Sequence, residues 1–346
     1  MSADRPAVDN LSAPAAEAHL SAEPVTTVDV HTHLAPLLVD AKVDDLVTTA
    51  EDGRHVVAGH PVGPLTLHRP QALLAYLDAA GLDAAVVTVP PPYHGQHLAG
   101  GDSARWAVAV NDGLLARVAD QPRLRPLAYL PLHEPAVALA EYRRVRTDAR
   151  WWGVTAGAGG RIPSLADPAF APLFEALHAD RRALLLHPSA SPDARLDEFY
   201  LGNLLGNPVE TAVAVAQLVL GDVVARYPGL RLVLVHGGGV VPAVLGRWER
   251  GVATDRPGLV PLSLAPADAV RRMWTDCLTH QPSMTAVTAD VFGPDRLLLG
   301  SDWPFPMGTD DPAEFLGGRD DPRARRAATV NAVDAFGSRP GLPADH

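Results

Sequence analysis

LLLGSDWPFPMG, residues 297–308, joins an apolar run to an abrupt polar turn. The three leucines are typical of a strand inside a sheet, and Gly300 and Ser301 end the run before a lone carboxylate, Asp302. A stiff loop of aromatic and proline residues follows at 303–306. This placement predicts that the acid faces other polar residues at the ends of neighbouring strands.

The same layout recurs along the chain as an apolar run, a loop and an Ala/Leu-rich helical stretch. The runs predict strands at 25–30, 84–89, 126–130, 152–156, 183–186, 230–235, 273–277 and 296–300. The stretches between them predict helices at about 70–80, 104–118, 135–148, 168–179, 208–226, 240–250, 282–291 and 322–336. Eight such units with strands apolar on both faces predict an α/β fold, a parallel (β/α)8 TIM barrel. A doubly wound sheet is the alternative, but it needs fewer units, and no GxGxxG follows the first strand.

Two connections are long enough to be insertions. Residues 34–69, after the first strand, predict a small β insertion, and residues 188–229, after the fifth, hold an extra segment before the next helix. We expect residues 25–340 to form one barrel domain. Residues 1–24 have no basic start followed by an apolar run, so we expect a flexible tail rather than a signal peptide.

Composition excludes several classes of protein. The formal net charge of the 346 residues is −11, which argues against nucleic acid or an anionic membrane as partner. No apolar stretch reaches the roughly 18 residues of a membrane helix. A single cysteine, Cys277, excludes an internal disulfide and a thiolate-rich zinc site, and it fits a reducing cytoplasm. Any metal must therefore be held by His, Asp or Glu.

Histidines end three of the predicted strands. His31 and His33 alternate at the end of the first strand, which places both on one face. His187 ends the fifth strand, and His236 ends the sixth beside three glycines. With Asp302 they meet at the carboxyl edge of a barrel, where such enzymes carry their sites. A single histidine after a strand is usually a packed residue, but this common register favours a metal site.

The ligand set predicts one divalent ion. His31, His33, His187 and Asp302 suit Zn²⁺ or a similar ion with an open position. Two-metal barrels often use a carboxylated lysine, and the only lysine, Lys42, is far from the fourth and fifth strands. His236 is then assigned to proton transfer, with a fourth ligand or a loop-holding role as alternatives.

The segments HTH, HPSA, HGGGVVPAVLGR and GSDWPFPMG together resemble the metal-dependent decarboxylases of the amidohydrolase superfamily, of the aminocarboxymuconate-semialdehyde decarboxylase type. The resemblance runs over residues 25–336. It implies one ion, usually zinc, on the four ligands above, His236 as acid/base, and a homodimer in which Arg247 reaches the neighbouring site to hold a substrate carboxylate. The family's arginine in the first insertion has no clear match, and Ser189 and Ala190 replace its Trp-Asp pair, so the substrate stays open.

These observations favour non-oxidative decarboxylation of a small aromatic or unsaturated carboxylic acid. Hydrolysis of a lactone, amide or ester is the alternative, because a bound ion also activates water. A metal-free binding barrel would leave the ligand register unexplained. Besides Arg247, the residues predicted to contact substrate are Trp303, Tyr93, His94, His280 and Arg161.

Overall fold

The computed structural model describes residues 26–38 and 43–337, and it contains one eight-stranded parallel sheet. Its strands pair in chain order: β1 (Val28–His33), β5 (Ala84–Thr88), β6 (Leu124–Tyr129), β7 (Gly153–Ala158), β8 (Ala183–Pro188), β9 (Arg231–Leu234), β10 (Trp274–Asp276) and β11 (Leu297–Leu298). The amide of Val30 donates to Leu299 O (2.8 Å) and that of Asp302 to His31 O (2.8 Å), which joins the last strand to the first. The predicted (β/α)8 barrel is confirmed.

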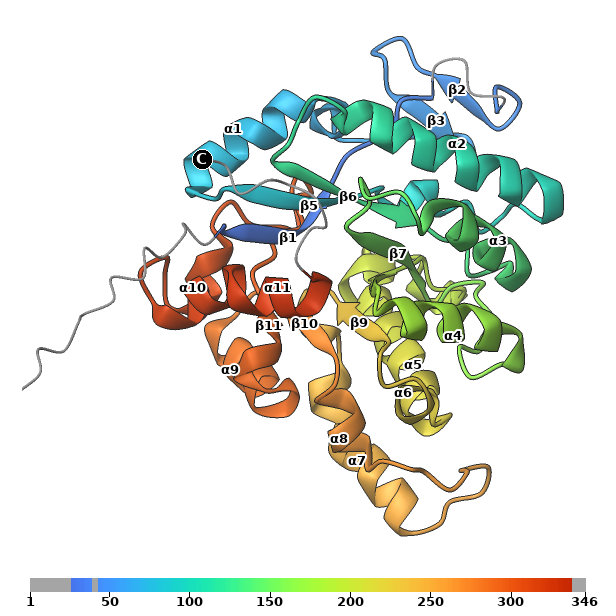
Figure 1. Cartoon of the computed structure of the whole chain (residues 1–346), viewed down its shortest axis with the longest axis vertical. Helices are drawn as coiled ribbons and strands as arrows, with labels where there is room; N and C mark the ends of the chain where they lie inside the picture. Colours follow the sequence, from blue (N-terminus) through green and yellow to red (C-terminus); the bar gives the residue numbers. More distant parts are fainter. Residues whose placement is uncertain (1–25, 39–42, 338–346) are drawn as a thin grey trace, which may run out of the picture.

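Helices surround the sheet (Figure 1). They are α1 (Pro70–Ala80), α2 (Gly100–Val118), α3 (Pro135–Val145), α4 (Ala171–Asp180), α5 (Asn207–Leu220), α6 (Val223–Arg226), α7 (Val241–Ala253), α8 (Pro266–Val270), α9 (Pro282–Phe292), α10 (Pro322–Ala328) and α11 (Val330–Phe336). Two predicted helices are divided. Asp222 adopts a left-handed conformation (φ 58°) between α5 and α6, and Thr329 (φ −120°, ψ −91°) separates α10 from α11.

The strands bury both faces, in two separate apolar clusters. One face joins the helices in the larger cluster. The other face forms a second cluster with residues from β1, β5, β6, β8 to β11 and α11 and with Trp152, which directly precedes β7, and this cluster fills the barrel. Phe336 of α11 stacks on Trp152 with ring centroids 4.8 Å apart, so α11 packs against the barrel interior. Strands buried on both faces explain the continuous apolar runs of the sequence.

The first strand lies three residues later than predicted. It extends to His33, so the two histidines lie within β1 rather than beyond it. Its register with β5 shifts between Asp29 and Thr32, which is the mark of a β-bulge. Residues 1–24, the predicted tail, and Lys42 lie outside the described residues.

The insertion after β1 forms a small antiparallel sheet, as predicted, of β2 (Val47–Thr49), β3 (His55–Val57) and β4 (His60–Pro61). The segment after β8 contains a π-helical turn, Gly202–Gly206, that leads into α5. The sequence did not predict α8, which with α7 and the intervening loop projects from the barrel at the bottom of Figure 1. Over the described residues no helix is long and apolar enough to cross a membrane.

Candidate metal centre and active site

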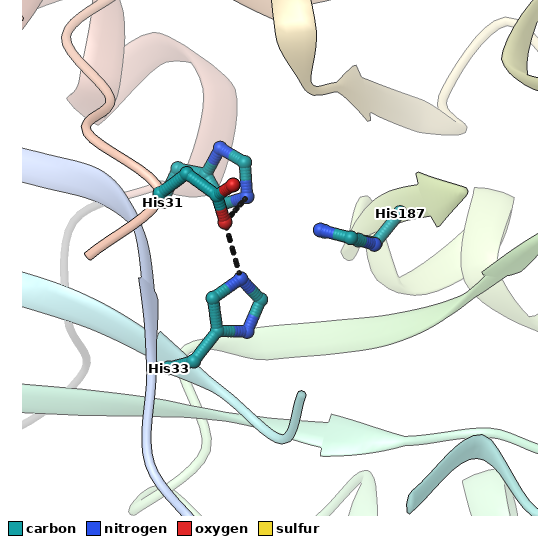
Figure 2. A group of neighbouring side chains, drawn as sticks. His31, His33 and His187 are labelled. Carbon is teal, nitrogen blue, oxygen red and sulfur yellow. Dashed lines mark hydrogen bonds and ion pairs between the residues drawn. The ribbon is translucent and has the colours of Figure 1, made fainter. Parts of the chain in front are cut away.

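The four predicted ligands converge at the carboxyl ends of the strands. His31 and His33 come from β1, His187 from β8, and Asp302 from the turn after β11. One ligand atom from each lies within 4.8 Å of all the others, and all four residues are buried. Figure 2 shows the three imidazoles turned toward a common region.

Asp302 is the centre of this group. Its Oδ1 lies 3.0 Å from Nε2 of His33 and 3.2 Å from Nε2 of His31, and its Oδ2 lies 3.5 Å from Nε2 of His236. The residue has a positive φ of 60°, which turns its carboxylate back from the loop toward β1. This backbone conformation lets an acid placed just after the end of β11 reach the histidines of β1.

Each ligand imidazole is oriented through its other nitrogen. Nδ1 of His31 lies 2.7 Å from Oδ2 of Asp276, and Nδ1 of His187 lies 2.9 Å from the carbonyl oxygen of Pro188. Carboxylates and carbonyls only accept, so both Nδ1 atoms carry a proton and Nε2 is the atom of each ring left to bind an ion. Nδ1 of His33 is held by Thr88 Oγ1 at 2.9 Å. Partners of this kind fix the tautomer of metal-binding histidines.

Two of these Nε2 atoms are orphaned. Nε2 of His31 and Nε2 of His187 are buried, and neither makes a hydrogen bond among the described residues, although Nε2 of His31 lies 3.2 Å from Oδ1 of Asp302. A buried polar atom without a partner costs free energy. Two imidazole lone pairs and a carboxylate facing one point fit a single divalent ion, and such a ligand set with further room suits an open catalytic site.

The electrostatics of the group also favour a cation. Burial alone would lower the pKa of His31, but the carboxylates of Asp302 and Asp276 outweigh it and raise that pKa to about 10. Burial opposes ionisation of Asp302, yet His31 and the other imidazoles hold the pKa of its carboxyl well below the usual range. Burial, reinforced by His33, lowers the pKa of His187 well below its usual value, so this ligand is neutral. The carboxylates thus favour a positive charge next to a neutral imidazole ligand, which is what the binding of a divalent ion requires.

Asp276 was not among the predicted site residues. It is fully buried, and its second oxygen, Oδ1, accepts from the amides of Gly237 (2.9 Å) and Leu278 (3.1 Å). It therefore ties the His31 ring to the backbone that follows His236. The available signal was an acid at the end of a strand, as for Asp302, but TDC at residues 275–277 offers no histidine or second acid to mark it.

A cavity of about 720 Å³ opens beside the ligands. Its walls are mainly apolar, and its polar floor contains His187, His236 and Asp302. The side chain of His236 is 18% exposed, whereas those of His31 and His33 are fully buried. His236 is thus the imidazole best placed to meet a bound molecule. Phe305, whose ring lies 5.2 Å from that of His33, forms part of the wall.

The residues predicted to contact substrate are divided by the structure. His280 lines the cavity. Tyr93 is buried and its hydroxyl lies 2.7 Å from Nδ1 of His55, and Trp303 packs on Tyr76. His94 is buried behind the ligands, stacked on Tyr129.

Arginines are missing from the described cavity wall. Arg161 and Arg247 are exposed, and neither belongs to the wall. Arg247 lies on the projecting helix α7 and makes no ion pair within the described part of the chain, so the structure offers no local salt bridge to explain it.

Comparison with known proteins follows this geometry. The model of the family described as Amidohydrolase matches residues 28–337. The chain belongs to this amidohydrolase family. It is 28% identical over 251 residues to 2-amino-3-carboxymuconate-6-semialdehyde decarboxylase of Dictyostelium discoideum, covering 71% of this chain and 70% of that protein. It is 30% identical over 230 residues to gamma-resorcylate decarboxylase of Rhodococcus jostii, covering 59% and 67%.

Solved structures of the family share the fold. The 5-carboxyvanillate decarboxylase of Sphingomonas paucimobilis superposes with a TM-score of 0.77 at 25% identity, over 90% of this chain and 99% of that one. A dihydroxybenzoic acid decarboxylase of Polaromonas, solved with manganese and 2-nitroresorcinol, superposes with a TM-score of 0.73 at 19% identity, over 90% and 97%. The predicted family membership is confirmed.

Proposed function

We propose that the chain is a metal-dependent, non-oxidative decarboxylase of a small aromatic or unsaturated carboxylic acid. The observation that carries the proposal is the buried group of His31, His33, His187 and Asp302 at the floor of an apolar cavity. The relatives described above are decarboxylases of such acids, which supports the same reaction here.

The ion would be held by the four ligands. When bound, a divalent ion supplies a Lewis acid that polarises a substrate oxygen and orients the scissile carboxylate. Imidazole and carboxylate ligands suit Zn²⁺, which the sequence resemblance favours, and Mn²⁺, which the Polaromonas structure contains. Reconstitution of the metal-stripped chain with each ion, followed by measurement of bound metal and CO2 release, distinguishes them.

His236 would move the proton. As the bond to CO2 breaks, its electron pair stays on the substrate carbon, which must then take a proton. Nε2 of His236 faces the cavity and lies 3.5 Å from Oδ2 of Asp302, a carboxylate that can hold the protonated imidazole in position. The apolar wall, including Phe305, excludes water and packs against a planar substrate.

A homodimer would complete the site. No lysine or arginine lines the described cavity, although a carboxylic acid substrate needs a counter-charge. Arg247 is exposed on α7 and can serve the cavity of a neighbouring subunit. Beside the cavity mouth, Phe199 and Tyr200 are 81% and 64% exposed, and apolar surface of this size supports burial against a second copy.

We also infer that the chain works in a reducing cytoplasm, because its cysteine, Cys277, is a free and buried thiol.

Hydrolysis of a lactone, amide or ester remains the second candidate, since the same ligands serve both reactions in this family. The test is incubation with aromatic and muconate-like acids and, separately, with lactones, while CO2 and titratable acid are measured. CO2 release with proton uptake supports the decarboxylase. Acid release without CO2 would overturn it.

The role of Arg247 has its own test. Arg247→Ala and His236→Ala subunits are each expected to be inactive as homodimers. Mixed dimers should recover part of the activity, because one of the two sites then has an intact His236 and a neighbour's intact Arg247. No recovery would place Arg247 outside the neighbouring site.

A further inference from the structure

A second cavity lies at the opposite end of the barrel from the metal ligands. It has a volume of about 590 Å³ and is bordered by residues that precede or begin the strands β8, β9, β10 and β11. Each of these four consecutive strands contributes one arginine to the wall, and the arginines are Arg181, Arg231, Arg272 and Arg296. Because parallel strands begin at one edge of a sheet, this spacing gathers the four guanidinium groups around one space.

The charge of this wall is unbalanced. Among the described residues of the wall, four arginines face one acid, Asp334, so their summed formal charge is +3 in a chain whose net charge is −11. Several other arginines of the barrel surface are paired, as in Arg123 with Asp78 at 2.6 Å and Arg146 with Asp180 at 2.6 Å. Within residues 26–38 and 43–337, none of the four cavity arginines makes an ion pair.

Two of the four arginines are also partly withdrawn from water, whereas Arg181 and Arg272 are exposed. Arg231 and Arg296 are half-buried. Burial lowers the pKa of Arg231, the positive charge of Arg181 lowers it further, and Asp334 raises it only in part. Like charges held together in a partly buried wall repel each other unless an anion lies between them.

Trp274 adds a second, independent observation. It lines the same cavity, is 7% exposed, and its buried indole N–H has no acceptor among the residues described. The guanidinium of Arg296 lies 4.3 Å from the centre of its ring, and Nε of Arg296 donates to Arg271 O. The stacked Trp274 fixes the plane of Arg296, and a guanidinium of fixed plane is suited to bidentate contact with an oxyanion.

We propose that this arginine cavity binds a compact multivalent oxyanion, the phosphate or polycarboxylate part of a small molecule, at a site separate from the metal centre. The cavity is within the size range of small-molecule sites. Its ligand bridges the starts of the strands whose far ends carry His187, His236 and Asp302. Binding therefore stabilises the half of the barrel that holds two of the four metal ligands, His187 and Asp302.

The test is calorimetric titration of the metal-loaded enzyme with inorganic phosphate and, separately, with tricarballylate, at constant ionic strength set by chloride. We expect saturable binding of one anion per chain. The double variant Arg231→Gln, Arg296→Gln should weaken it by about tenfold or more. Arg143→Gln changes an exposed arginine of α3 that does not line the cavity; it is the matched control and should bind as the unchanged chain does.

The outcomes separate the two anion sources and the two sites. Binding of phosphate alone assigns a phosphorylated ligand, and binding of tricarballylate alone assigns a polycarboxylate. Metal content and CO2 release should stay unchanged in the double variant, which distinguishes this cavity from the metal centre. The absence of saturable binding, or equal binding by the double variant, would overturn the proposal whatever reaction the metal centre performs.

Discussion

Replacing Asp276 by asparagine tests whether the metal site depends on the orientation of its ligands. The carboxylate accepts three hydrogen bonds, from Nδ1 of His31 at 2.7 Å and from the amides of Gly237 and Leu278 at 2.9 and 3.1 Å. Asparagine has nearly the same shape but only one accepting oxygen, and its NH2 group can only donate. It cannot satisfy all three donors.

The two possible orientations of the amide have different costs. If the oxygen faces His31, two buried backbone N–H groups lose their acceptor, at about 1–3 kcal/mol each. If the oxygen faces the two amides, the NH2 group meets Nδ1 of His31, which must then give up its proton. The proton moves to Nε2, the atom that should bind the ion. The second orientation costs the fold less, so the loss should appear in metal affinity.

We expect Asp276→Asn to weaken metal binding by about 10- to 100-fold, the usual cost of losing a ligand's supporting carboxylate. A competition titration against a coloured chelator measures this, and circular dichroism checks the fold. Asp222→Asn is the control, since Asp222 accepts hydrogen bonds from the amide and hydroxyl of exposed Ser263 and takes no part in the metal site. Unchanged affinity in a folded Asp276→Asn chain would refute the tautomer argument.

Three further predictions concern individual histidines. His187→Ala should lose the bound ion in elemental analysis of the purified chain, and full occupancy would disprove its place as a ligand. His236→Gln should keep the ion but release CO2 about 10²- to 10⁴-fold more slowly, because general acid catalysis is lost; retention of the full rate would assign the proton to another group. Burial, with the charges of His68 and Arg117, lowers the pKa of His55 to about 4. The unfolded chain therefore binds a proton on His55 more tightly than the folded chain does. The free energy of unfolding should fall by roughly 1–2 kcal/mol, after allowance for partial exposure, as the pH falls from about 6.5 to 4. Thermal unfolding of His55→Gln should depend less on pH over this range.

The sequence was sufficient for the barrel and the ligand group because both follow from simple periodicities. Eight apolar runs buried on both faces allow few folds other than a parallel barrel. Polar residues at the carboxyl ends of such strands meet at one edge, so His187 and Asp302 could be placed together although 114 intervening residues separate them. Neither inference needed a side-chain contact.

Side-chain roles that depend on packing were not accessible in the same way. Tyr93 and His94 follow β5 at the catalytic edge, yet both are buried. Tyr93 is held by the small sheet after β1, and His94 stacks on Tyr129. An aromatic side chain near the site can line the cavity or pack in the core, depending on the local backbone conformation. The sequence alone does not specify that conformation. Asp276 was missed for the same reason, because two of its three donors, His31 and Gly237, come from distant segments.

The β-bulge in β1 shows how a local irregularity builds the metal site. Val28 and Val30 belong to the cluster inside the barrel, so strict alternation would turn His31 and His33 outward. The register shift after Asp29 inserts one residue and returns both histidines to the interior. A bulge removes an amide from the ladder, and here Oδ1 of Asp29 accepts from the His31 amide at 2.9 Å and from Ser301 at 3.2 Å.

Asp29 thus joins the bulge of the first strand to the turn that carries Asp302. Its other oxygen accepts from the hydroxyl of Tyr76 on α1 at 2.8 Å, and burial raises the pKa of its carboxyl to about 6. A buried acid would be costly without these donors. Because the two backbone donors, His31 and Ser301, belong to the segments that supply three of the four ligands, the acid keeps those ligands in one register. Residues that never touch an ion can therefore decide whether the ligand atoms converge.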